Sequence, residues 1–242
     1  MKKAIVCFLM FILAGMIACA STQSGNATQQ LTQTQAHTQE VVPTGQPSTS
    51  TSQSTSTTPP TSGSQFNPNI SYGTFTDLRD SQTYRTVRIG NLTWMAQNLN
   101  FVMANSHCYD NDNSNCDKYG RLYTWDAAME TCPVGWRLPT RQDWEDLVRE
   151  ADGRDAAGSR LKSQTGWSDN GNGTDRFGFS ALPGGIRFGG SFNGVGTIDS
   201  WWSATEGRSG NAWFRYMGSG SSRADELSLS KSNGFSVRCV SD

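Results

Sequence analysis

The chain has 242 residues, a formal net charge of −1 at pH 7 and a very uneven composition. All eight tryptophans lie beyond residue 90, whereas residues 20–65 are nearly all Ser, Thr, Gln, Pro and Gly. Such a stretch cannot bury enough apolar surface to offset the entropy of ordering it, so we expect a disordered linker followed by one folded domain over residues 66–242. The chain also lacks a basic patch, which excludes nucleic acid as an expected partner.

The first residues have the layout of an export signal. Lys2 and Lys3 precede a short apolar stretch that is too short to span a membrane, and Ala18 precedes Cys19. The order Met16-Ile17-Ala18-Cys19 resembles the bacterial lipobox. It implies a signal peptide over residues 1–18, a lipidated Cys19, and a linker over residues 19–65 that ties the domain to a membrane. We expect a lipoprotein of the cell envelope, displayed from the outer membrane; an ordinary secretory signal is the alternative.

The folded part opens with strand patterns and continues with helix patterns. Two β-rich runs, Tyr84–Ile89 and Leu92–Met95, flank Gly90-Asn91, a turn that favours a hairpin. The apolar spacing i, i+3, i+4, i+7 predicts a helix with a buried stripe of Trp125, Ala128, Met129 and Cys132. A second helix opens at Thr140, where Asp143 completes a capping-box pattern.

The second half of the domain is rich in loops and strands. A short helical piece near residues 156–162 is followed by segments dense in Gly, Asn and Asp, which we expect on the surface. Strand patterns return at residues 201–204, 212–217, 226–230 and 235–240. The order predicts an α+β domain with two main helices, antiparallel strands and long irregular loops.

Four cysteines remain after Cys7 leaves with the signal and Cys19 takes the lipid. An even number in an oxidising compartment implies two disulfides. Cys108 and Cys116 flank a polar loop and are expected to close it as a small ring, which leaves Cys132 with Cys239. A zinc site of four thiolates would need paired short spacings that this sequence lacks.

Calcium is the metal that the sequence offers a place for. The loop after residue 168 carries the oxygen donors Asp169, Asn170, Asn172 and Asp175, and a second cluster lies at residues 110–114. Neither cluster fits the EF-hand pattern. Turn chemistry is the alternative, because Asp, Asn and Gly also serve backbone conformation.

A candidate ligand-binding surface lies on the late strands. Trp201 and Trp202 are adjacent, so they point to opposite faces and one is expected to be exposed if the other is core. The aromatic platform with polar donors that sugar rings require would then be formed by Trp202, Trp213, Arg215 and Tyr216. Core packing is the alternative for each of these tryptophans.

Catalytic patterns are sparse. His107 is the single histidine of the folded part, so a nucleophile–histidine arrangement would depend on it alone. A pair of carboxylates for glycoside hydrolysis would be recognised only in a cleft. We therefore expect no catalytic residue from the sequence.

Several motifs in a fixed order resemble one family. They are Trp94–Asn100, Cys116–Trp125, Gly135–Pro139, Phe179–Gly185 and Gly234–Cys239. Together they resemble the Fibrobacter succinogenes major paralogous domain over the whole folded part. This family is similar to the C-type-lectin-like fold, through the group that contains formylglycine-generating enzymes. The resemblance implies a lectin-like domain in which a first helix is bridged to the final strand, as Cys132–Cys239 would do.

The resemblance implies a fold more than an activity, because lectin-like folds host several functions. We expect a surface-displayed lipoprotein that binds a ligand, with a carbohydrate such as a plant cell-wall polysaccharide first and a protein partner second. The alternatives are an enzyme on the same fold, either formylglycine-generating-like or carbohydrate-active, and a purely structural display protein. A pocket with two carboxylates or a free thiol would favour an enzyme, and an exposed Trp202 or Trp213 would favour binding.

Overall fold

The computed structural model describes residues 65–242, which lie within one compact unit. The predicted signal peptide, the predicted lipidation site Cys19 and the predicted linker fall outside the described residues. Within residues 65–242, no helix is both long enough and apolar enough to cross a membrane.

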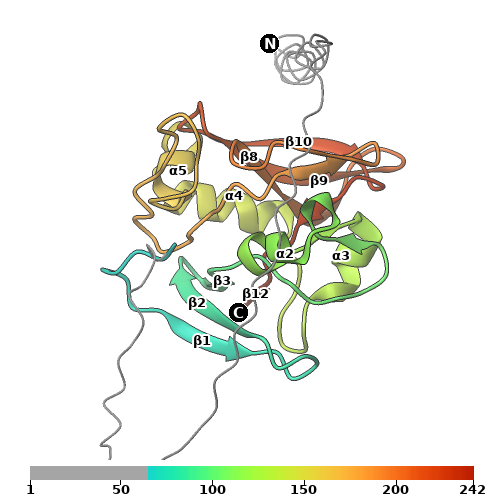
Figure 1. The fold of residues 1–242 in the computed structure, drawn as a ribbon. Helices are drawn as coiled ribbons and strands as arrows, with labels where there is room; N and C mark the ends of the chain where they lie inside the picture. Colours follow the sequence, from blue (N-terminus) through green and yellow to red (C-terminus); the bar gives the residue numbers. More distant parts are fainter. Residues whose placement is uncertain (1–64) are drawn as a thin grey trace, which may run out of the picture. The chain divides into compact units, whose positions relative to one another are not determined.

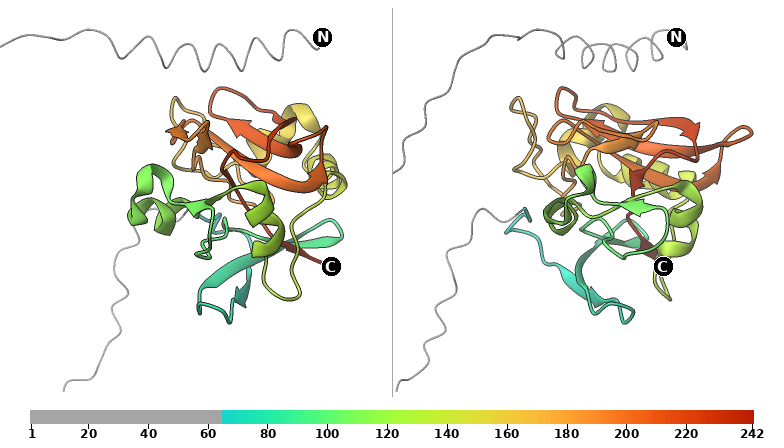
Figure 2. Two further views of the ribbon diagram at one scale, coloured as in Figure 1. Left: turned by 90° about the vertical axis from the view of Figure 1, so that its right-hand side faces the viewer. Right: turned by 45° about the vertical axis from the view of Figure 1, so that its right-hand side comes forward.

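The domain is built on two main sheets and has the predicted α+β character (Figure 1). The larger sheet has the order β10-β9-β8-β11-β5-β4, with bounds Ala224–Ser230, Asn211–Gly218, Ile198–Glu206, Phe235–Ser236, Leu122–Tyr123 and Ser106–His107. The smaller sheet has the order β1-β2-β3-β12, with bounds Gly73–Thr76, Thr83–Ile89, Leu92–Met95 and Val240–Ser241. A separate hairpin joins β6 and β7, Ile186–Phe188 and Ser191–Asn193. In both views of Figure 2, the β1–β2 hairpin and the β8–β10 strands lie at opposite ends of the domain.

The large sheet separates two hydrophobic clusters. Trp201 belongs to one cluster, with side chains from α4 (Arg141–Glu150) and α5 (Arg154–Leu161). Trp202 belongs to the other, with side chains from α3 (Trp125–Thr131). Both indole rings are 0% exposed, because each face of β8 is covered. The expectation that Trp202 is exposed is therefore wrong.

The predicted hairpin and the predicted capping box are confirmed. β2 and β3 pair antiparallel around Gly90 and Asn91. The Thr140 hydroxyl accepts a hydrogen bond from the Asp143 backbone N–H, and the Asp143 carboxylate accepts one from the Thr140 backbone N–H. This reciprocal cap sets the start of α4 and turns Trp144 into the core.

Two helical details differ from the sequence pattern. Met129 is 45% exposed rather than buried, because the buried face of the short α3 runs through Trp125, Ala127, Ala128 and Thr131. The predicted polar loop between Cys108 and Cys116 contains a 3-10 turn, η1 (Tyr109–Asn111), and the start of α2 (Asn113–Tyr119). Asp112 caps α2 by accepting a hydrogen bond from the Ser114 backbone N–H. The acid cluster at residues 110–114 therefore serves local turn and cap geometry.

The last predicted strand is divided between the two sheets. β11 pairs parallel with β8 and antiparallel with β5, whereas β12 pairs antiparallel with β3. The chain crosses from one sheet to the other over residues 237–239. Phe235, Val237 and Cys239 still share one buried cluster, as the alternation predicts. The C-terminal segment thus joins both sheets.

Both predicted disulfides are present in the structure. Cys108 is bonded to Cys116 across 8 residues, and Cys132 is bonded to Cys239 across 107 residues. The longer bridge ties the residue after α3 to the segment between β11 and β12. It closes the loop that contains α4, α5 and the β8–β10 strands.

Removal of the two bridges is expected to have unequal effects. On the chain-entropy relation, replacing Cys132 and Cys239 with Ala lowers the free energy of unfolding by about 4 to 5 kcal/mol, and replacing Cys108 and Cys116 lowers it by about 2.5 kcal/mol. Urea unfolding of the two double variants and the wild type measures both losses. A larger loss from the small ring would contradict this account of the fold.

Candidate functional site

The motifs that carry the family resemblance converge on one buried polar network. Asn98 follows β3, Ser180 lies in the loop after α5, and Arg238 lies between β11 and β12. Asn98 is 7% exposed, and Ser180 and Arg238 are 1% exposed each. Three segments that are distant in sequence therefore bring their polar side chains into the interior.

The Asn98 side chain is the centre of this network. Its Oδ1 accepts hydrogen bonds from Trp201 Nε1 at 2.8 Å and from Arg238 Nε at 3.0 Å. Its Nδ2 donates to Asp199 Oδ2 at 3.0 Å and to the Tyr119 carbonyl at 2.9 Å. The amide thus lies between a cation and an acid. Only the orientation with Oδ1 toward Arg238 and Nδ2 toward Asp199 provides an acceptor for the cation and a donor for the acid.

Arg238 is held mainly by backbone carbonyl oxygens. Its guanidinium donates to the carbonyls of Met95, Phe179 and Ser180 and lies 4.3 Å from the centroid of the Phe179 ring. Burial lowers the pKa of Arg238 to about 9, although the negative charges of Asp199 and Asp175 oppose this shift. The cation therefore depends on its surroundings for compensation.

Asp199 is the acid on the other side of Asn98. Its Oδ1 accepts hydrogen bonds from Ser236 Oγ at 2.9 Å and from the Ser200 backbone N–H at 2.7 Å. Burial raises the pKa of Asp199 to about 7, and these hydrogen bonds counteract part of the shift.

A second acid supports the loop that carries Ser180. Asp175 accepts hydrogen bonds from the Ser180 backbone N–H and from Ser180 Oγ, both at 2.7 Å. These two bonds hold Ser180 at φ +53°, an uncommon conformation for a residue with a side chain. Tyr72 also contacts Ser180 Oγ at 3.2 Å. Burial raises the pKa of Asp175 to about 6.

Two glycines allow the surrounding segments to approach the network. A Cβ at Gly120, where φ is +78°, would lie 2.7 Å from Asn98 Cβ. A Cβ at Gly184 would lie 3.2 Å from both Asp199 Oδ2 and Tyr119 Cβ. Both glycines belong to the family-like motifs, and both bring α2 and its neighbouring loop against the buried acid and amide.

A pocket of about 170 Å³ opens beside this network. Asn98, Ser180 and Arg238 form its inner side, and α2 supplies one wall through Cys116, Asp117, Lys118 and Tyr119. The remaining polar lining comes from Gln65, Gln82, Tyr84, Gln97 and Asn100. We call this space the amide pocket, because five of its lining side chains are Asn or Gln amides.

One polar atom of the amide pocket stands out. Asn100 Oδ1 is buried, and no group in the described part of the chain donates a hydrogen bond to it. An unpartnered buried acceptor costs free energy that a bound donor would recover. Among the described residues that line this pocket, Asn100 therefore carries a buried acceptor whose hydrogen bond is not made.

The surface predicted from the late strands does not form a platform. Trp202 is fully buried, and Arg215 is 4% exposed, with its guanidinium next to Glu226. Trp213 is partly exposed but covered by the Arg141 guanidinium, 4.1 Å from the ring centroid. Tyr216 lies on the opposite face of β9 and packs against Phe214. Trp202 and Arg215 are therefore buried residues rather than parts of an exposed platform, whereas Trp213 and Tyr216 are partly exposed.

The predicted calcium donors form hydrogen bonds within the protein or lie in turns. Asp175 is 0% exposed and holds Ser180, and Asn172 Oδ1 accepts a hydrogen bond from the Trp167 backbone N–H. Asp169 and Asn170 are exposed and adopt positive φ values, as turn residues do. Within residues 65–242, no group of three or more His, Cys, Asp and Glu side chains is arranged to hold a metal ion. Asp175 and Asn172 therefore already serve the fold through these hydrogen bonds.

Within residues 65–242, the His107 side chain forms no hydrogen bond or ion pair with a carboxylate or a nucleophile. It lies on β4, where partial burial and the charges of Arg187 and Arg121 lower its pKa. The amide pocket carries one carboxylate, Asp117, and its cysteine is in a disulfide. This pocket therefore contains neither a pair of carboxylates nor a free thiol.

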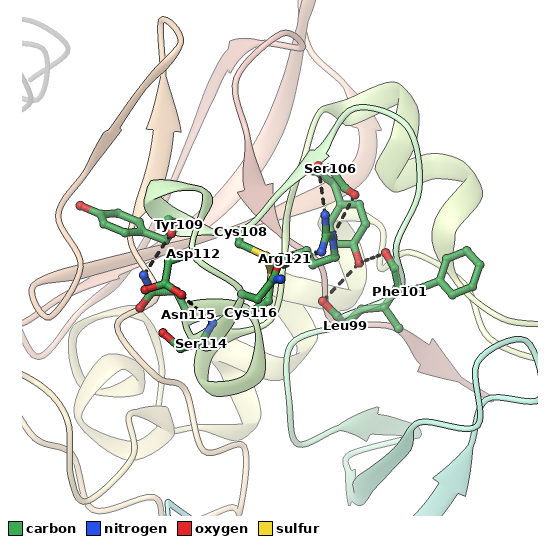
Figure 3. The surroundings of a disulfide bond; sticks show 12 residues. Leu99, Phe101, Ser106, Cys108, Tyr109, Asp112, Ser114, Asn115, Cys116 and Arg121 are labelled. Atoms are coloured by element: carbon green, nitrogen blue, oxygen red, sulfur yellow. Dashed lines mark hydrogen bonds between the residues drawn. A yellow bond between two sulfur atoms is a disulfide. The ribbon is translucent and has the colours of Figure 1, made fainter. Parts of the chain in front are cut away.

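The small disulfide is accompanied by a cation. Arg121 Nη1 lies 3.4 Å from the sulfurs of both Cys108 and Cys116 (Figure 3). Its Nε also donates to Ser106 Oγ at 3.0 Å. The sequence offered no signal for this contact beyond the presence of Arg121 in the motif.

Residues 87–241 match the model of the Fibrobacter succinogenes major domain. The match covers more than half of the chain, so the protein belongs to this family. No curated protein and no solved structure matches the sequence. The network residues Asn98, Ser180, Asp199 and Arg238 all lie within the matched range.

Substitution of Asn98 is expected to be strongly destabilising. Asn98→Ala leaves Arg238 Nε, Trp201 Nε1 and Asp199 without their amide partner, at a cost of about 3 to 5 kcal/mol. Asn98→Asp should cost at least as much, because a second carboxylate cannot donate to Asp199. Chemical denaturation measures both values, with Gln142→Ala on the exposed face of α4 as the control. A loss within about 0.5 kcal/mol of that control would contradict the network.

The buried acids predict a fall in stability as pH rises. Asp175 and Asp199 keep protons in the folded state that the unfolded chain releases above about pH 4. Their protonation contributes stability that is lost as pH rises through about 6 and about 7. Urea unfolding should therefore give a lower free energy of unfolding at pH 7.5 than at pH 5.

The matched variant for this profile is Asp199→Asn, whose side chain cannot ionise, so the decline in the free energy of unfolding with pH should be flatter. Because the pKa of His107 is lowered in the folded state, this histidine makes the free energy of unfolding rise with pH until its ordinary pKa is passed. The comparison is therefore made in a His107→Gln background, which removes this opposing effect. A free energy of unfolding that rises from pH 5 to pH 7.5 in that background would contradict the raised pKa values of Asp175 and Asp199.

Proposed function

We propose that this domain is a ligand-binding module and that the amide pocket is its binding site. The observation that carries the proposal is the unpartnered Oδ1 of Asn100 in a pocket lined with amide groups. Each amide offers both a donor and an acceptor, which matches the dual hydrogen bonding of hydroxyl groups. A carbohydrate is therefore our first candidate, and a polar segment of a protein partner is the second.

The size and charge of the pocket support a small neutral ligand. Its volume of about 170 Å³ is below the range of about 300 to 1,000 Å³ that is usual for drug-sized ligands. This suits one sugar ring of a polysaccharide better than several rings. Asp117 and Lys118 contribute opposite charges at the α2 wall, and the buried Arg238 guanidinium on the inner side already donates to backbone carbonyl oxygens.

The setting that we propose is the cell envelope. The lipobox-like sequence before Cys19 supports a lipid anchor, and the linker to residue 65 supports display away from the membrane. The two disulfides fit an oxidising compartment. The helix-to-C-terminus bridge and the mixed α+β architecture support a lectin-like fold, with outer-membrane surface display as its context.

Carbohydrate binding is tested with a glycan array probed with the mature chain, with and without a calcium chelator. We expect binding to plant cell-wall or envelope glycans, and the chelator arm reports whether calcium contributes. A blank array under both conditions would remove carbohydrate from the proposal and leave the protein partner.

Substitutions of residues that line the pocket locate the site. Asn100→Ala and Gln82→Ala each remove one hydrogen-bonding side chain and should weaken binding by about 3- to 10-fold, the usual effect of one neutral hydrogen bond. Calorimetric titration with the glycan found on the array measures the dissociation constants. Trp213→Ala, outside the pocket, is the control, and weakening by that variant alone would place the site on the late strands instead.

A further inference from the structure

The cation beside the small disulfide is fixed before any reaction takes place. Arg121 Nη1 is 3.4 Å from both sulfurs, Nη2 donates to the Ser106 carbonyl at 3.3 Å, and the Arg121 backbone N–H donates to the Leu99 carbonyl at 3.0 Å (Figure 3). In the described part of the chain, no carboxylate lies within ion-pair distance of this guanidinium. Its charge is therefore directed at the sulfur pair.

A disulfide is neutral, so a nearby cation stabilises it little, whereas the same cation strongly stabilises a thiolate. When the bond is cleaved, one sulfur leaves as a thiolate, and a charge-assisted hydrogen bond from Arg121 stabilises it. A better-stabilised leaving thiolate makes thiol–disulfide exchange faster and the reduced pair more stable. Arg121 thus favours the reduced form over the disulfide.

The two bridges also differ in the surroundings of their sulfurs. Cys108 and Cys116 are 5% and 4% exposed, and Cys116 lines the amide pocket. Cys132 is partly exposed, but its partner Cys239 is 0% exposed and belongs to the hydrophobic cluster around Trp202. Attack on Cys132 would therefore expel a thiolate into an apolar cluster, whereas attack on Cys116 expels the Cys108 thiolate beside Arg121.

We propose that Cys108–Cys116 is a redox-active disulfide that exchanges with an external dithiol. A thiolate of the dithiol attacks Sγ of Cys116, the S–S bond breaks, and the electron pair goes to the Cys108 sulfur beside Arg121. The second thiolate of the dithiol then attacks the mixed disulfide and releases Cys116. The pair has gained two electrons and two protons, and the dithiol has become a disulfide.

Reduction also changes the amide pocket, a consequence that rests on the proposed function. The bridge ties α2 to the residue after β4, and α2 supplies Asp117, Lys118 and Tyr119 to the pocket wall. Opening the bridge removes this covalent tie and loosens the wall. Backbone hydrogen exchange of α2 should accelerate at least tenfold in the selectively reduced protein, and an unchanged rate would overturn this link.

Timed reduction with dithiothreitol tests the exchange itself and needs no ligand, so it succeeds or fails independently of carbohydrate binding. The folded full chain is treated for increasing times, alkylated and analysed by peptide mass spectrometry. We expect Cys108 and Cys116 to be alkylated at least tenfold faster than Cys132 and Cys239. Equal rates for the two bridges would overturn the proposal, and this comparison requires no variant.

Variants test the role of the cation. Arg121→Gln should slow reduction of the short bridge about tenfold, because the leaving thiolate loses its charge partner, and Arg121→Lys should recover most of the rate. Arg88→Gln removes an exposed arginine on β2 and is the matched control. An Arg121→Gln protein with native circular dichroism and an unchanged rate would overturn the assignment of Arg121.

Discussion

The domain depends on the position of one amide between a buried cation and a buried acid. Asn98 accepts from Arg238 and donates to Asp199, and it also accepts from the indole of Trp201. Removing ions from water costs several kcal/mol each, so neither charge would be tolerated here without such partners. The network therefore fixes the relative positions of β3, β8 and the segment between β11 and β12.

This constraint extends from the core to the surface. Gly120 and Gly184 have no side chain, so α2 and the loop after Ser180 can lie directly against Asn98 and Asp199. The rigid network becomes the inner side of the amide pocket, and α2 becomes its wall. A polar core thus supports a polar site, and the disulfide between Cys108 and Cys116 secures the wall from outside.

Local patterns in the sequence predicted the local structure well. The hairpin around Gly90, the cap at Thr140 and both disulfides followed from spacing and turn chemistry. The pattern failed for Trp202, because alternation along a strand does not reveal that both faces of its sheet are covered. It also missed α2, in which only Cys116 and Tyr119 are buried, too few to mark a helical period. The network itself was not predictable, because Asn98 meets Asp199 and Arg238 across 101 and 140 residues of sequence.

The most direct test of the network is hydrogen exchange at the indole N–H of Trp201, measured by NMR. That hydrogen is donated to Asn98 Oδ1 at 2.8 Å inside a fully buried ring, so it should exchange only when the whole domain unfolds. The partly exposed Trp213 provides the comparison within the same spectrum. The predicted result is that the free energy of opening derived from the Trp201 indole exchange rate equals the free energy of global unfolding. Exchange through a local opening, at a rate near that of Trp213, would contradict the central place given to Asn98.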